Sequence, residues 1–315
     1  MTIVTGTLLT FSAIGNREDL SDMIYDISST DTPFTAGIGK NKAKGVYHEW
    51  QTDELAAAAA NAQIEGNETT FAAITPTVRV GNRCQILDKE CIVSGTQEAV
   101  DKAGRKSEMV REMLKRTKEL KRDREFVMLN NQAPVTGDST TARQLRPVNS
   151  WITTNTSRNA TGTPGANGSS STAATDSSVK RALTEDLVKD VLRDAWTAGG
   201  EPDTIMVGPL NKQKVSGWTA GTTKFDKSED KKLTAAIDVY ASDFGDLKIV
   251  PNRFQRERDL WVLDLDLWKL SELRPMFTKD LAPTGDHVKG LIITECTLEA
   301  CNEAGSGVVA DLVDS

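Results

Sequence analysis

The feature that most constrains this chain is an amphipathic pattern that runs from residue 97 to residue 131. Apolar side chains recur there at three- and four-residue spacing, which is the period of one face of an α-helix. A continuous helix over this range would extend for about 50 Å, roughly three times the usual helix length. Gly104 is the position where we expect such a helix to bend. The apolar face consists of Ala99, Ala103, Val110, Met113, Thr117, Leu120 and Val127.

Charged residues on the same stretch are spaced four apart, which favours stabilising ion pairs along a helix. Between Glu98 and Glu125, ten basic residues stand against seven acidic ones. The basic surplus has two interpretations, a solvated helix face or a weakly basic surface for nucleic acid. The expected ion pairs are Glu98–Lys102, Asp101–Arg105, Glu112–Arg116 and Lys121–Glu125. The basic face would consist of Arg111, Lys115, Lys118 and Arg122.

Residues 45–87 predict a long β-hairpin with a broad tip. Val46 to Asp53 and Thr75 to Leu87 have strand composition, and an alanine-rich segment lies between them. An isolated hairpin is marginally stable in water, and its edges can pair with another chain. A projecting hairpin therefore implies a partner surface, although a hairpin that lies on its own domain fits the pattern as well. The candidate contact residues are Val46, Trp50, Leu55, Asn61, Ile64 and Phe71.

The N-terminal region predicts an extended arm followed by a short helix over residues 17–28. Asn16 is its expected cap, acidic residues occupy the first turn, and Thr32-Pro33-Phe34 ends it. Residues 150–179 are rich in serine, threonine, glycine and asparagine, which predicts an exposed excursion without a core. The apolar stripe of the short helix consists of Leu20, Met23, Ile24 and Ile27.

Residues 180–275 predict a mixed α/β region. Thr184 caps a helix that Gly199-Gly200 ends, and Pro209 begins a second one. A closing strand over LIITECTLEA has Ile292, Thr294, Cys296, Leu298 and Ala300 on one face and Glu295 and Glu299 on the other. The fold class is therefore α+β. The strands expected before the closing one lie at residues 204–207, 236–241, 246–250 and 259–264.

No pattern indicates catalysis, a metal site or a cofactor. The two histidines, His48 and His287, occur in unrelated contexts, and the loop Gly37-Ile38-Gly39-Lys40 lacks the other residues of a phosphate-binding loop. Asp264 and Asp266 are expected on the polar face of a strand. The net charge of −7 excludes strong general binding to nucleic acid, and no apolar run is long enough to predict a membrane partner. The cysteines, expected to be reduced, are Cys84, Cys91, Cys296 and Cys301.

Three stretches carry a resemblance to a known family. They are DLSDMIYDISSTDTPFTAGIGKNKAKGVYHEWQTDEL, TQEAVDKAGRKSEMVREMLKRTKELKRDREFVML and DLWVLDLDLWKLSELRP. They resemble the SU-ten-type podovirus major capsid proteins, which have the Hong Kong 97-like fold. The order of arm, hairpin, long helix, α/β region and closing strand is also similar to that fold. The first stretch is the most specific, because the second has the composition of many amphipathic helices.

The resemblance implies a protein that assembles as hexamers and pentamers into an icosahedral phage head around double-stranded DNA. The implied partners are further copies of the chain, a separate scaffolding protein, a portal, a cement or decoration protein, and DNA through weak contacts. Assembly would occur in the bacterial cytoplasm. The implied segments are an N-terminal arm (1–44), an extended loop (45–87), a peripheral domain (88–149) with a spine helix (97–131), an exposed insertion (150–179), an axial domain (180–265) and a return to the peripheral domain (266–315).

Three other functions stay open at the level of sequence. An encapsulin-like compartment would share the fold but enclose an enzyme cargo. A tail or receptor-binding protein would have more strand repeats, and a cytosolic enzyme would require a catalytic motif. A lysine–asparagine cross-link between subunits is not expected, because no lysine occurs from Gly45 through Asp88. We therefore expect a non-covalent shell.

Overall fold

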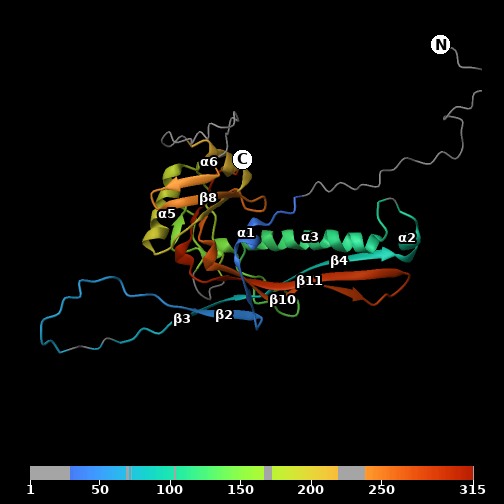
Figure 1. Ribbon diagram of the computed structural model, residues 1–315, viewed down its shortest axis with the longest axis horizontal. Coiled ribbons are helices and arrows are strands. Elements are labelled where there is room, and N and C mark those ends of the chain that lie inside the picture. The colour runs from blue at the N-terminus through green and yellow to red at the C-terminus, as the bar shows by residue number, and fades with distance from the viewer. Residues whose placement is uncertain are drawn as a thin grey trace, which may run out of the picture.

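A computed structural model describes residues 29–314, except 69–70, 72, 103, 167–171 and 219–237. The predicted arm and the helix over residues 17–28 lie outside the described residues. The first layer is a four-stranded sheet in the order β1-β10-β11-β4, and one long helix, α3, covers one of its faces (Figure 1). The bounds of these elements are β1 Gly39–Lys42, β10 Trp268–Leu281, β11 His287–Ala300, β4 Gln85–Ser94 and α3 Glu108–Leu129.

The predicted single helix over residues 97–131 is wrong in its first part. A short helix, α2 (Gly95–Ala99), precedes α3, and the chain between them turns at Gly104, whose φ is +75°. Each helix has its own cap, because the Ser94 hydroxyl accepts from Gln97 N and the Ser107 hydroxyl accepts from Val110 N. With 22 residues, α3 extends for about 33 Å rather than 50 Å.

The face of the sheet under α3 is apolar because strand residues alternate between faces. Cys91 and Gly290, which pair across β4 and β11, both contact the side chain of Met113 on α3. The predicted apolar face of β11, from Ile292 to Ala300, is buried as expected. Glu295 and Glu299 point to the opposite face, as predicted, but they are also buried there.

The hairpin is formed by β2 (Tyr47–Thr52) and β3 (Val78–Arg83), which pair antiparallel (Figure 1). The second strand is shorter than the predicted Thr75–Leu87. The chain leaves the hairpin at the buried Cys84 and enters β4 at Gln85, in a different sheet. We call residues 53–77, which connect β2 and β3, the loop tip.

The second layer is a six-stranded sheet in the order β5-β12-β9-β6-β8-β7. The predicted helices are confirmed as α5 (Glu185–Thr197), which begins after Thr184, and α6 (Pro209–Ser216). Part of the predicted strand 236–241 lies outside the described residues. The strands are β5 Asn155–Ser157, β12 Gly307–Val309, β9 Leu260–Leu263, β6 Thr204–Val207, β8 Gly245–Pro251 and β7 Val239–Ser242.

The exposed excursion predicted for residues 150–179 is wrong for much of its length. It begins inside the buried helix α4 (Val148–Trp151) and continues into β5, which pairs parallel with β12. Polar residues pack here because other residues satisfy them. Asp311 has a φ of +61°, and its carboxylate accepts from Ser177 N at 2.6 Å and Asn159 N at 3.0 Å.

An ion cluster fixes the same segment to the six-stranded layer. Arg256 bonds to Asp176, and it lies 3.2 Å from the carboxylate of Asp259. Burial raises the pKa of Asp259 to about 6, although Arg256 and Arg158 oppose that shift. The segment boundary at residue 265 also shifts, because β12, assigned by sequence to the 266–315 return, lies in the six-stranded sheet beside β9.

Several local predictions are corrected as well. Gly39 and Lys40 belong to β1, which pairs parallel with β10, rather than to a flexible loop. Asp264 caps a 3-10 turn, η1 (Leu265–Leu267), instead of lying on a strand. Pro33 begins a short helix, α1 (Pro33–Gly37), and a second 3-10 turn, η2, spans Glu303–Gly305. All four cysteines are free. Within the described residues, no helix has the length and apolar character needed to cross a bilayer.

Candidate assembly surfaces

The base of the hairpin is fixed inside its own subunit. The Trp50 indole donates to Ala300 O at 2.8 Å, and its ring lies 5.4 Å from that of Trp151. Trp50 was predicted to contact another chain, whereas these two partners lie in its own chain.

Asn82 on β3 is the central polar residue of this base. Its side-chain nitrogen donates to Arg146 O at 3.0 Å and to Leu298 O at 2.7 Å. Its side-chain oxygen accepts from Arg146 N at 2.8 Å and from Arg83 N at 2.9 Å. The Arg146 guanidinium lies 4.2 Å above the ring of Trp151, and burial lowers its pKa to about 10. One side chain therefore connects the hairpin, the 145–151 region and β11.

Glu299 is the acceptor at the edge of the same base. Its Oε2 accepts from Ser271 at 2.7 Å and Asn41 at 2.9 Å, and lies 3.1 Å from His48 Nε2. Burial raises the pKa of Glu299, but these hydrogen bonds outweigh burial and hold the pKa below its ordinary value. Because Glu299 lies on the face of β11 away from α3, the hairpin is attached to that face. Its contacts explain why Glu299 is buried.

The loop tip differs from the base in exposure and charge. Leu55, Phe71 and Ile64 are 99%, 93% and 84% exposed. Asn61 is exposed too, and Val46, just before β2, is 43% exposed. The sequence of the tip contains four acidic residues and no lysine or arginine. The tip therefore exposes large apolar side chains to water on a projecting loop.

A second exposed apolar surface lies on the four-stranded sheet, on the face opposite α3. We call it the open sheet face. The strand register places Phe277 beside Ile293, and it places Lys289 on β11 between Ile92 on β4 and Leu281 on β10. Ile92 is 61% exposed, which is unusual for an isoleucine in a strand. Its apolar members are Ile86, Ile92, Phe277, Leu281, Leu291 and Ile293.

The predicted basic residues do share one face of α3, turned away from the sheet. Arg111 bonds to Glu112 at 2.9 Å, and the Arg122 guanidinium lies 5.4 Å from the centre of the Phe254 ring. Lys115 and Lys118 are exposed. Of the four predicted ion pairs along this stretch, Glu98–Lys102 is present at 3.7 Å. The face is basic but partly neutralised by its own helix.

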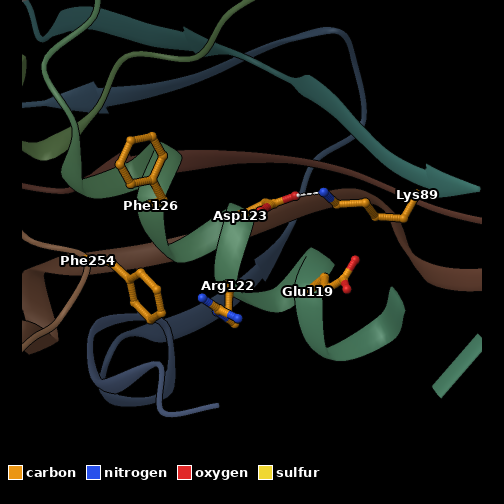
Figure 2. Close-up of a pocket in the computed structure, with 6 residues that line it drawn as sticks. All are labelled: Lys89, Glu119, Arg122, Asp123, Phe126 and Phe254. Carbon is orange, nitrogen blue, oxygen red and sulfur yellow. Dashed lines mark ion pairs between the residues drawn. The ribbon is translucent and has the colours of Figure 1, made fainter. Parts of the chain in front are cut away.

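A hollow of about 360 Å³ adjoins this basic face near the end of α3 (Figure 2). Phe126 and Phe254 border one side, and Arg122 lies between Phe254 and Glu119 in the view. Lys89 from β4 reaches across to Asp123 at 2.7 Å. The hollow joins α3, β4 and the loop after β8, so it lies where the two layers meet.

Comparison with known proteins identifies the family. The model of the SU10 major capsid protein family matches residues 3–313. This chain belongs to that family. A curated major capsid protein of Escherichia phage Phieco32 is 26% identical over 330 residues, with 94% of each chain covered. Family membership supports the phage capsid among the functions that the sequence left open, and the chain is a major capsid protein of the virion.

Solved structures show the same fold at low identity. The capsid protein of a native GTA particle has a TM-score of 0.64 at 11% identity and covers 96% of this chain and 98% of its own. A structure of phage G major capsid and decoration proteins has a TM-score of 0.57 at 11% identity, with 99% and 100% covered. The Hong Kong 97-like fold predicted from the resemblance is thereby confirmed.

Two parts of these surfaces were missed by the sequence analysis. The open sheet face involves β10, where the sequence analysis predicted no strand, so its apolar residues were not grouped with those of β11. Asn82 was also missed, because a buried asparagine leaves no periodic signal. Val80 and Asn82 are two residues apart in β3, so they point to the same face of the strand, and both are buried. This alternation offered a weak signal for an inward face.

Proposed function

We propose that copies of this capsid protein form hexamers and pentamers, in which the loop tip of one copy lies over the open sheet face of the next. These capsomers close into an icosahedral head around double-stranded DNA. The observation that carries the proposal is the pair of exposed apolar surfaces. Both lie on the same side of the four-stranded sheet, because the hairpin is attached to the face opposite α3 through Glu299.

Burial of these surfaces supplies the driving force for association. Transfer of apolar area from water stabilises a contact by about 25 cal/mol per Å². Phe71 is 93% exposed and Ile92 is 61% exposed. Contact with a neighbouring copy would therefore bury apolar area that their own subunit leaves in water. Repetition of one modest contact around a ring closes a symmetric assembly without a single strong site.

The proposed contact also implies which side of the subunit faces the interior of the shell. Neighbouring loop tips cover the open sheet face, so the opposite side, with α3, faces the interior. Lys115 and Lys118 would there meet the phosphates of packaged DNA. Non-specific contacts of this kind weaken steeply as salt rises. We further propose that assembly in the host cytoplasm uses a scaffolding protein and a portal, with a cement protein on the outside, and that no catalytic step is involved.

Sedimentation of purified variants tests the loop contact. Ile92→Lys places a charge on the open sheet face and is expected to weaken association at least tenfold while the subunit stays folded. Val110→Lys is the matched control, because Val110 is 60% exposed on α3, on the other side of the sheet. Equal assembly by both variants, or equal loss, would contradict the proposed contact.

The absence of covalent links is tested on mature particles. Boiling in denaturant and reductant should release the chain as a 34.2 kDa monomer. The loop tip has no lysine to attack a neighbouring asparagine, and the four cysteines are free. A ladder of resistant multimers would contradict the non-covalent shell. Nucleic acid inside the same particles, rather than a protein cargo, is expected.

A further inference from the structure

The outer face of α3 combines basic side chains with exposed apolar ones. Helix periodicity places Leu114 among Lys115, Lys118 and Arg122 on the side away from the sheet. Leu114 is 63% exposed. DNA offers phosphates for the lysines but no partner for a leucine. The mixed character of this face fits an acidic, amphipathic peptide better than nucleic acid alone.

The described chain begins beside this face. Phe34 N and Thr35 N, at the start of α1, each donate to the buried carboxylate of Glu125 at 2.8 Å. Glu125 lies less than one turn from Arg122 on the same helix. Figure 1 shows α1 next to the end of α3 that packs against the six-stranded layer. The start of α1, near the first described residue, therefore lies close to the Arg122 end of the basic face.

The sequence just before that point has the complementary chemistry. Residues 17–28 contain four acidic residues and one arginine, together with the apolar stripe from Leu20 to Ile27. As a helix, twelve residues would extend for about 18 Å, close to the roughly 17 Å of helix between Leu114 and Glu125. The spacing of the acidic residues also matches that of the basic ones. Asp19 and Asp26 are seven residues apart, and so are Lys115 and Arg122.

We propose that residues 17–28 of the same chain bind along the outer face of α3. The apolar stripe covers Leu114 and reaches Phe126 at the hollow of Figure 2, while Asp19 and Asp26 pair with Lys115 and Arg122. Exposed ion pairs of this kind are individually weak and sensitive to salt. The bound segment neutralises the face proposed for DNA, so DNA entering the head must displace an acidic segment that the capsid protein itself supplies.

Photo-cross-linking of the full-length chain tests this binding. A photoreactive amino acid replaces Leu114, an exposed position whose change leaves the fold intact. After irradiation at low salt, mass spectrometry should find the cross-linked peptide within residues 17–28. The same photoreactive residue at Trp196, which is 53% exposed on α5, is the control and should not capture this segment. The measurement involves neither DNA nor shells, so its outcome is independent of the proposed function.

Charge exchange and isotope mixing complete the test. Asp19→Lys with Asp26→Lys should lower the cross-link yield at least fivefold, and adding Lys115→Glu with Arg122→Glu should restore it. In a mixture of ¹⁴N- and ¹⁵N-labelled chains, the cross-links should join peptides of the same label. Cross-links to another region, links between differently labelled chains, an absence of cross-links, or a yield that ignores the charge changes would each overturn the proposal.

Discussion

The base and the tip of the hairpin belong to one continuous segment, yet they have opposite physical characters. At the base, Trp50 and Asn82 are held by partners from two other parts of the chain, β11 and the 145–151 region. At the tip, Leu55 and Phe71 are nearly as exposed as in an unfolded chain. The base is stabilised by its own subunit, whereas the tip leaves apolar area exposed that the proposed contact with another copy would bury. The two regions can therefore be separated experimentally, since changes at the base should affect folding and changes at the tip should affect assembly.

The largest effect is expected for Asn82→Ala. The substitution removes a side chain that makes four hydrogen bonds and leaves buried backbone groups of Arg146 and Leu298 without partners. Unfolding free energy should fall by about 3–5 kcal/mol. Urea denaturation followed by circular dichroism measures it. A loss below about 1 kcal/mol would show that the base does not depend on this residue.

Trp50→Ala is expected to cost somewhat less, about 2–4 kcal/mol, because the ring is only partly buried. Trp50→Phe is the matched control. It keeps most of the ring contact with Trp151 but removes the hydrogen bond to Ala300, so a loss of about 1 kcal/mol is expected. If the two variants were equally unstable, the hydrogen bond would outweigh the ring packing.

Glu299 is expected to make the unfolding free energy depend on pH. Its pKa is lower in the folded protein than the ordinary value of 4.5. The unfolded chain therefore takes up the proton first as pH falls. The stabilisation is complete above the ordinary pKa and is lost as pH falls through the folded pKa. The stability difference between wild type and Glu299→Gln, measured in urea from pH 7 to pH 3, should shrink toward the acid end.

The smallest effect on folding is expected at the tip. Phe71→Ser should change unfolding free energy by less than about 0.5 kcal/mol, because the ring contacts almost nothing in its own subunit. Assembly should nevertheless fail or weaken strongly, as electron microscopy would show. Loss of stability comparable to that of Trp50→Ala would mean that the tip folds onto its own subunit.

The sequence predicted regular elements well where one period dominates. Helix α5 and the face of β11 are as expected because their apolar positions repeat, whereas α6 was predicted from Pro209 at its start. The 97–131 pattern was misread because Ser107 and Gly104 mark a helix start and a turn inside a continuous amphipathic pattern. The Ser-x-x-Gln spacing from Ser94 to Gln97 was a further capping signal that periodicity ignores.

Polar packing was beyond what composition could predict. Residues 150–179 have the composition of an exposed loop, yet Asn155 and Ser177 are buried because residues far along the chain bond to them. Asp311, which lies more than a hundred positions away, is one of these partners. The loop tip shows the converse. Its exposure was foreseen, but the sheet face that complements it comes from strands that only the fold brings together.

The pairing of β5 with β12 also has a consequence in time. These strands are about 150 residues apart in sequence, yet they lie side by side in the sheet. Contacts of such long range slow folding, because the intervening chain must be ordered before the pairing contributes any stability. Each newly made subunit would therefore pass through a period in which the six-stranded layer is still open. Exposed strand edges in that interval favour aggregation. The rate at which subunits become competent, rather than their final affinity, would then limit how fast a head can grow.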